Sequence, residues 1–96
     1  MGKYSLKKLP SDIMHEVALK HRSLRKSKKL SQSELAERSG VSLGSIKRFE
    51  QTGQISFGSL LKLAHILSRL NDFDSLFVKN ESEIPENLFS EKMRNQ

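Results

Sequence analysis

The sequence predicts an all-α domain of five short helices between residues 11 and 77. Three observations support this fold class. Apolar residues recur three or four positions apart in several segments, a spacing that places them on one face of a helix. No segment alternates apolar and polar residues over the length of a strand. Serine and glycine stand at the ends of the periodic segments, where helices need caps and left-handed stops.

The first helix is expected to begin after Pro10, with Ser11 or Asp12 as its N-cap, because short oxygen-bearing side chains accept hydrogen bonds from a first turn. It is expected to end near residues 28–29. Its apolar stripe consists of Ile13, Val17 and Leu24, with His21 on the same face. A histidine on such a stripe is interpreted as a packed or capping residue rather than as a metal ligand.

The next two helices are marked by serine caps and glycine stops. Ser31 and Glu34 have the spacing of a capping box, and Gly40 supplies the left-handed position that ends the second helix. Ser42 is expected to cap a third helix that extends to about Gln51. The residues expected to face the core are Leu35, Ala36, Ile46 and Phe49.

Ser56 is expected to cap a fourth helix, which residues 71–72 interrupt. The apolar stripe of this helix consists of Leu60, Leu63, Ala64 and Leu67. Phe73, Leu76 and Phe77 predict one short closing helix. We therefore divide the chain into a flexible basic arm (residues 1–10), a helical domain (residues 11–77) and an acidic tail (residues 78–96).

The net charge of +6 is unevenly distributed along the 96 residues. Residues 1–29 carry +7, residues 30–70 carry +2 and residues 71–96 carry −3. A basic first half favours a polyanionic partner, and duplex DNA is the densest polyanion in a cell. The acidic end favours a contact other than DNA, or solvent alone.

The composition disfavours several classes of function. The chain has no cysteine, which excludes disulfides, thiolate metal ligands and cysteine nucleophiles. No two of the three histidines have the i, i+4 spacing of a helical metal site, and no nucleophile-bearing turn motif occurs. No apolar run approaches the ~18 residues that span a bilayer. We expect a cytoplasmic protein with no catalytic activity, no cofactor and no metal.

The most informative stretch is residues 30–50, LSQSELAERSGVSLGSIKRFE. Two short helices joined by a glycine-containing turn make a helix-turn-helix. This motif needs a small residue where the helices touch, a turn residue that tolerates positive φ, and a branched apolar residue that packs back on the first helix. Ala36, Gly40 and Ile46 meet these three needs in order. A generic helical hairpin is the alternative interpretation.

With these residues, the segment from Val17 to Phe77 resembles the phage-repressor (XRE/Cro-type) helix-turn-helix family, and SFGSLLKLAHIL resembles the fourth helix of that family. The resemblance implies a lambda-repressor-like fold. GVSLGSIKRFEQTG and LNDFDSLF are most similar to regulators encoded beside HipA-type kinases, that is, to HipB-like antitoxins.

The resemblance also implies roles for individual positions. Gln32 matches a glutamine that contacts a DNA phosphate and braces the recognition helix, which would extend from Ser42 to Gln51. Glu50 matches an acid that more often serves structure than base reading. Arg48 or Lys47 is suited to guanine O6 and N7, and Leu43 to a thymine methyl group. The full set predicted to contact DNA is Gln32, Ser42, Leu43, Gly44, Ser45, Lys47, Arg48 and Gln51.

A second set is predicted to contact phosphates near the end of the first helix. It consists of Arg22, Arg25, Lys26, Lys28, Lys29 and Ser31. For the basic residues, a solvated helix face is the alternative interpretation. The basic arm at residues 3–8 either enters a minor groove or is a flexible terminus.

Three positions depart from the family pattern. Gly44 stands where a polar base-reading residue is common, and Lys29 stands where glycine usually ends the first helix. The turn at Lys29 must therefore be left-handed without glycine, or differ in shape. Gln51 and Thr52 replace a common Asn-Gly pair, which puts the phosphate contact of that loop in doubt.

The sequence thus predicts a homodimeric repressor of a palindromic operator, identified with a HipB-like antitoxin that autoregulates its operon. Its expected partner is a HipA-like kinase toxin or the small partner subunit of that toxin. The alternatives are a stand-alone phage-type repressor and a protein-interaction adaptor that does not bind DNA. In the tail, i, i+4 apolar pairs favour partner binding, with plain disorder as the alternative. The residues in these pairs are Ile84, Leu88, Phe89 and Met93.

Overall fold

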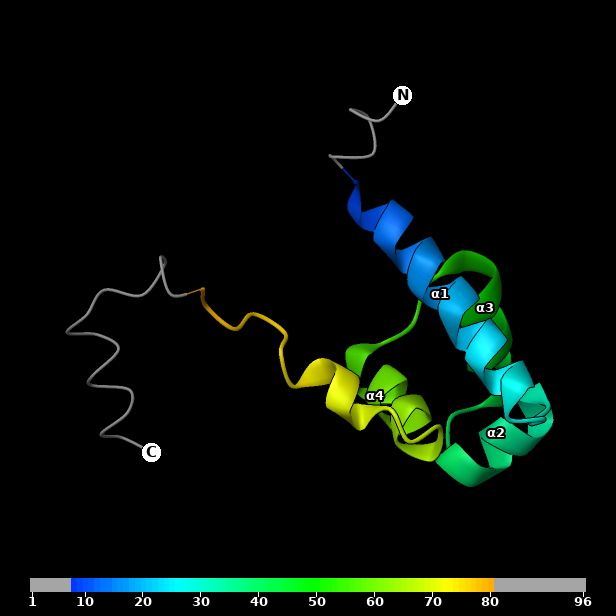
Figure 1. Ribbon diagram of the computed structural model, residues 1–96. Coiled ribbons are helices and arrows are strands. Elements are labelled where there is room, and N and C mark those ends of the chain that lie inside the picture. Colours follow the sequence, from blue (N-terminus) through cyan, green and yellow to red (C-terminus); the bar gives the residue numbers. More distant parts are fainter. Residues whose placement is uncertain (1–7, 81–96) are drawn as a thin grey trace.

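The computed structural model describes residues 8–80, which form four α-helices and one short 3₁₀ helix (Figure 1). The α-helices are α1 (Pro10–Ser27), α2 (Gln32–Ser39), α3 (Leu43–Thr52) and α4 (Phe57–Ile66), and the 3₁₀ helix is η2 (Leu70–Phe73). No strand occurs within this range. The prediction of an all-α domain is therefore confirmed. Most of the predicted arm, and the tail residues Ile84, Leu88, Phe89 and Met93, lie outside the described residues.

The first helix begins earlier than the sequence predicted. Leu9 is the N-cap residue and Pro10 occupies the first helical position. A backbone N–H group at that position has no acceptor within the helix, so proline, which lacks this group, is tolerated there. The Asp12 side chain does not cap the helix from outside; its Oδ2 accepts a hydrogen bond from the Leu9 N–H group at 2.8 Å. The predicted cap at Ser11 or Asp12 is therefore wrong, because proline can start a helix as well as precede one.

At the other end of α1, the chain turns through Lys29, which has a φ of +59°. Few residues other than glycine adopt this left-handed conformation, since Cβ then crowds the backbone. The Leu30 N–H group after the turn donates to the Arg25 carbonyl oxygen at 3.2 Å. The turn is thus left-handed without glycine, one of the two options that the sequence left open.

We expect Lys29→Gly to stabilise the domain by about 0.5–1 kcal/mol, because glycine removes the left-handed strain at a cost in unfolded-chain entropy. Urea denaturation of both proteins measures the change in the free energy of unfolding. Lys29→Ala is the control, since it removes the same charge and keeps the strain. Equal stabilisation by alanine and glycine would assign the effect to the charge instead of the backbone.

The predicted caps of the next three helices are confirmed. The hydroxyl groups of Ser31, Ser42 and Ser56 accept hydrogen bonds from the N–H groups three residues later, at 3.0–3.1 Å. The Ser31 N–H group donates to Glu34 Oε1 at 2.8 Å, which completes the capping box. Gly40 and Gly53 end α2 and α3 with φ of +81° and +83°. Serine and glycine therefore fix both ends of the two helices in the motif.

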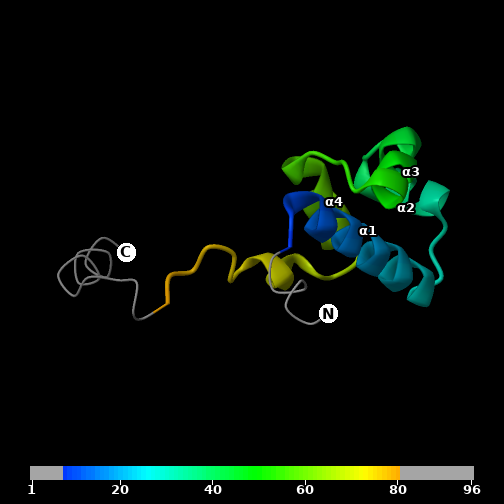
Figure 2. The same cartoon turned by 90° about the horizontal axis from the view of Figure 1, so that it is seen from above.

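The core lies where α2, α3 and α4 meet, with α1 packed across α3 (Figures 1 and 2). The fully buried large side chains are Leu35, Ile46, Phe49, Leu63 and Leu67. All five belong to the predicted inward faces. Ala36 is only half-buried but packs against this core, as a small residue at the helix contact should.

The predicted fifth α-helix is absent from the described residues. The chain leaves α4 through Ser68, with φ of +61°, and forms only the four-residue η2 before a turn. Phe77 is 99% exposed and Leu76 is 49% exposed, so neither is held by the core. A segment this short has too few hydrogen bonds to offset helix nucleation without tertiary packing. The five-helix count is therefore wrong. None of the helices described is long and apolar enough to cross a bilayer.

Candidate nucleic-acid interface

Helix α3 presents one apolar face to the core and one polar face to solvent. Ile46 and Phe49 are buried, whereas Leu43, the first residue of α3, is half-buried. The predicted DNA-facing residues that are exposed on or beside this helix are Ser42, Gly44, Ser45, Lys47, Arg48 and Gln51. The fold thus brings the predicted recognition residues together on one accessible helix.

The N-terminal end of α3 carries small, uncharged residues. The Ser42 hydroxyl accepts from the Ser45 N–H group at 3.1 Å and donates to the Ser45 hydroxyl oxygen at 2.8 Å. A Cβ atom added to Gly44 would meet no atom within 4 Å, so a larger residue would fit there. The absence of a side chain at Gly44 is therefore not imposed by packing. The charged groups of this face lie one turn further along, at Lys47 and Arg48.

A small hydrogen-bonded loop holds Arg48 at the end of α3. Arg48 Nη2 donates to Gln54 Oε1. The Thr52 hydroxyl donates to the Arg48 carbonyl oxygen at 2.7 Å and accepts from the Gln54 N–H group at 3.1 Å. Thr52 therefore organises the loop at the position where the resemblance implies a glycine. Sequence reasoning missed Gln54, because an exposed glutamine in a loop carries no signal of its own.

A buried cluster around Glu50 ties α3 to the two preceding helices. The Glu50 side chain is 3% exposed and receives two hydrogen bonds from Arg25 of α1, Nε to Oε2 and Nη2 to Oε1, both at 2.9 Å. Gln32 Nε2 of α2 donates to Glu50 Oε1 at 2.9 Å. His21 Nδ1 of α1 lies 2.8 Å from Glu50 Oε2. One carboxylate thus fixes α3 relative to both α1 and α2.

The cluster changes the interpretation of Arg25 and agrees with the structural roles that the resemblance implied for Glu50 and Gln32. The Arg25 side chain is 7% exposed, and its Nη1 also donates to the Leu30 carbonyl oxygen at 2.8 Å. Arg25 is therefore placed as an internal ion-pair partner, and its predicted phosphate contact does not fit this geometry. Glu50 serves structure, as its match implied. Gln32 makes the bracing contact that the resemblance implied, through Glu50.

His21 is packed, in agreement with its position on the apolar stripe. Its ring meets that of Phe49 edge-to-face, with centroids 5.0 Å apart, and its Nε2 atom has no hydrogen-bond partner among the described residues. The contact with Glu50 could not be foreseen, since a histidine and a glutamate on helices far apart in sequence show no joint pattern. Residues 8–80 contain no group of three or more His, Cys, Asp or Glu placed to hold a metal.

Burial and ion pairing act in opposite directions on the pKa values of this cluster. Burial raises the pKa of Glu50, but hydrogen bonds from Arg25 and Gln32 outweigh burial, so the pKa lies below its ordinary value. Burial lowers the pKa of His21 despite the nearby carboxylate. The hydrogen bond to Glu50 raises the pKa of Arg25. At neutral pH the cluster therefore holds a carboxylate, a guanidinium and an uncharged imidazole.

Acidification should destabilise the domain in two steps. The pKa of His21 is lower in the folded than in the unfolded chain, so the unfolded chain takes up the proton more readily. The contribution of the uncharged His21 to the free energy of unfolding is therefore full above pH ~6.5 and is lost as the pH falls toward the lower folded pKa. Glu50 adds a second loss below pH ~4.5, because its folded pKa is lowered and protonation breaks the pair. Urea denaturation at pH 7.5, 6.5 and 5.5 measures the first step.

His21→Gln should remove most of the change between pH 7.5 and 5.5, whereas a variant of the exposed His65, His65→Gln, should keep it. An unchanged pH dependence in the His21 variant would contradict the assignment.

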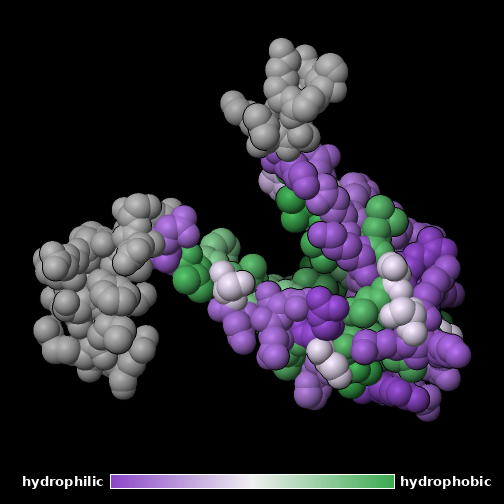
Figure 3. All heavy atoms as spheres, viewed as in Figure 1, coloured by the Kyte–Doolittle hydropathy of each residue, from purple (hydrophilic) through white to green (hydrophobic). Residues whose placement is uncertain are grey.

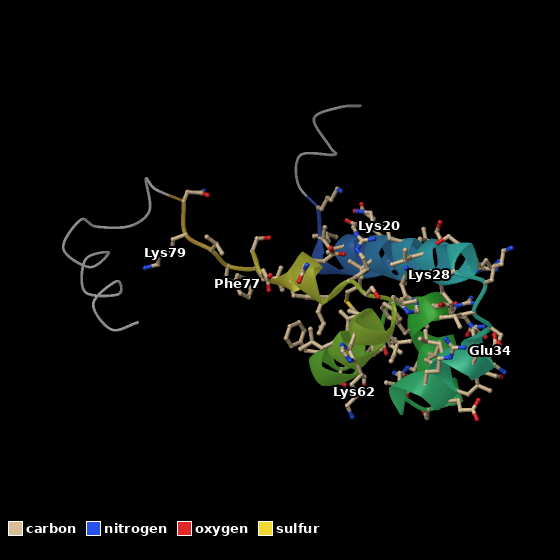
Figure 4. All side chains as sticks on the ribbon, turned by 60° about the horizontal axis from the view of Figure 1, so that its bottom comes forward. Lys20, Lys28, Glu34, Lys62, Phe77 and Lys79 are labelled. Carbon is tan, nitrogen blue, oxygen red and sulfur yellow. The ribbon has the colours of Figure 1, made fainter. Side chains whose placement is uncertain are left out.

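A polar hollow lies beside the end of α1, and Arg22 is the one exposed cation of the second predicted set among the described residues that line it. Arg22, Lys26, Lys28 and Lys29 are exposed, and Lys28, the C-cap residue of α1, is labelled in Figure 4. The hollow, about 360 Å³ in volume, is lined by Arg22, Arg25, Ser31, Gln32, Glu50 and Gln51. Three helices contribute to it. The hollow thus joins Arg22 and Ser31 of the predicted phosphate set to Gln51 at the end of α3.

Comparison with known proteins agrees with this arrangement. Residues 22–69, half of the chain, match the family model described as Helix-turn-helix. The matched range contains α2, α3, α4 and the basic end of α1. No match was found among curated proteins or among solved structures.

Proposed function

Because this chain belongs to the XRE-type helix-turn-helix family of DNA-binding transcription regulators, we propose that it is a homodimeric, sequence-specific repressor. Two copies would place their α3 helices about 34 Å apart, in successive major grooves of a palindromic operator. The observation that carries this proposal is the exposed polar face of α3, held in place from behind by the buried Glu50 cluster. A preorganised helix loses less conformational freedom when it binds.

Different residues would supply affinity and specificity. Arg22, Lys26 and Lys28 lie outside α3 and are suited to phosphates, which give affinity and its salt dependence. Lys47 and Arg48 are suited to guanine edges, and the small residues before them to phosphates and backbone approach. Gln32 would contact a phosphate and also brace α3. The hydrogen bond from its Nε2 to Glu50 Oε1 supports the bracing role.

We expect Arg48→Ala to weaken binding to the preferred site by about 1–3 kcal/mol and to change binding to unrelated DNA little. Gel shifts at one stated salt concentration would compare DNA from upstream of the protein's own gene with DNA of unrelated sequence. Lys62→Ala is the matched control, since Lys62 is an exposed cation on α4 away from α3 (Figure 4). Equal losses on both DNAs would overturn the assignment of Arg48 to base reading.

If the unmodified protein bound neither DNA, the result would favour the alternative function, a protein-interaction adaptor that has this fold and does not bind DNA.

The HipB-like motifs and the acidic end of the chain support a narrower role as an antitoxin. In that role the protein acts in the bacterial cytoplasm, represses its own operon, and binds a HipA-like kinase toxin or the small partner subunit of the toxin. The proposed partner-binding residues are Ile84, Leu88, Phe89 and Met93. Copurification with the product of a neighbouring kinase-like gene tests this role. A chain that ends at residue 80 should bind DNA and lose the kinase; a repressor that has no kinase partner would be of the stand-alone phage type.

A further inference from the structure

An apolar groove of about 440 Å³ lies between α1 and α4 and is not explained by DNA binding. Val17 and Leu24 of α1 form one wall, Leu60 and Ala64 of α4 form the other, and Leu76 closes the end near η2. Hydrophobic residues in the angle between these helices are visible in Figure 3. The volume is within the range of ligand pockets, so it can take several apolar side chains.

The described chain leaves the helical domain beside this groove, four residues before the part of the chain that the structure does not describe. Leu76 is part of its lining, and Figure 4 shows Phe77 and Lys79 on the segment that leaves the helices. Residues 77–83 span at most about 25 Å when extended, so the chain can turn back to the groove. A helix formed by residues 84–93 would be about 15 Å long.

The sequence of residues 84–93 has the pattern that a two-walled groove requires. At about 100° per residue, the four apolar residues and Pro85 cover roughly half of a helix circumference, an arc that also contains Lys92 in the last turn. Glu86 and Glu91 flank the two edges of this arc. Proline near the start is favourable in a helix. The apolar residues are Ile84, Leu88, Phe89 and Met93.

The charges of the two parts are complementary. Residues 8–80 carry a net charge of +6, whereas residues 81–96 carry −2. Lys20 stands at the rim of the groove and Arg69, also in the lining, pairs with Asp72 at 2.9 Å. A segment with exposed glutamates would thus meet a basic domain.

We propose that residues 84–93 dock as a short helix into the groove between α1 and α4 of their own chain. Docking covers the apolar walls and supplies the closing helix that residues 73–77 do not form. A partner that binds the same four apolar residues must first displace them from the groove. The proposal does not depend on DNA binding.

The absence of native cysteine allows a direct test in the full chain. Cysteines are introduced in pairs, Lys20→Cys with Lys92→Cys and, as a matched control, Lys28→Cys with Lys92→Cys. Lys20 and Lys28 are both exposed lysines at the α1 helix or its C-cap, but only Lys20 lines the groove. We expect the first pair to form an intramolecular disulfide about tenfold faster than the control, because docking raises the local concentration. Leu88→Asp added to the first pair should reduce its rate to that of the control.

Two results would overturn the proposal. Equal rates for the two pairs in the otherwise unmodified chain would show that the segment does not dock. Disulfide-linked dimers whose share rises with protein concentration would show that the groove takes a second copy. Neither result bears on the gel shifts that test DNA binding.

Discussion

Glu50→Ala should destabilise the domain by about 3–5 kcal/mol, because it leaves the Arg25 guanidinium buried without its counter-charge. The stability of a domain of about 70 ordered residues is itself only about 4–10 kcal/mol, so this one change can unfold most of the protein. Gln32 and His21 lose a partner at the same time. Urea denaturation followed by circular dichroism measures the loss.

Two further variants separate charge from packing. Glu50→Gln keeps the shape and one acceptor oxygen, and it should cost less than the alanine variant. The double variant Arg25→Met with Glu50→Met removes both charges and fills the same space, and it should recover much of the lost stability. A double variant no more stable than Glu50→Ala would mean that the loss comes from packing and not from an unpaired guanidinium.

Gly53→Ala should destabilise the domain by about 2–4 kcal/mol, which is more than Gly40→Ala at the other glycine stop. Both positions have nearly the same φ, +83° and +81°, so both variants carry the same left-handed strain. At Gly53, however, an added Cβ would lie 2.9 Å from the backbone carbon and oxygen atoms of Met14 in α1. At Gly40 it would meet nothing within 4 Å.

Comparing Gly53→Ala with Gly40→Ala measures the effect of one close contact, in which the turn after α3 approaches the backbone of α1. Gly40→Ala is expected to cost about 1 kcal/mol, from backbone conformation alone. The backbone of α1 cannot move aside as a flexible side chain can, so the additional cost at Gly53 must appear as loss of α1–α3 packing. Equal free energies of unfolding for the two variants would contradict this close contact.

Local features of the fold were predictable because their causes are local. The serine caps and glycine stops of α2 and α3 depend on residues within four positions of each other. The inward faces of α2, α3 and α4 follow from helical spacing alone. Two local expectations at the ends of the domain were wrong. Pro10 starts α1 where a cap was expected after it, and residues 73–77 lack the tertiary packing that a short helix needs.

The candidate site was predictable only in part. The exposed face of α3 follows from the motif, and so does the position of Gln32 beside it. The role of Arg25 does not, because an arginine among lysines on a basic helix looks like a surface residue. Only folding places Glu50, 25 residues later in the chain, against it. The contact of Arg48 with Gln54 was equally hidden, since it depends on the path of the loop after α3.

By itself, the sequence determined the helical class, the helix-turn-helix and the polar face of α3, because caps, glycine stops and apolar spacing act within one or two helical turns. Only the tertiary structure decided which charges face solvent and which are buried, and where the chain leaves an apolar groove open. Those outcomes depend on contacts between helices that are distant in sequence. The partners of the buried Glu50 carboxylate depend on how the helices are arranged in three dimensions. The spacing of residues along the chain does not indicate them.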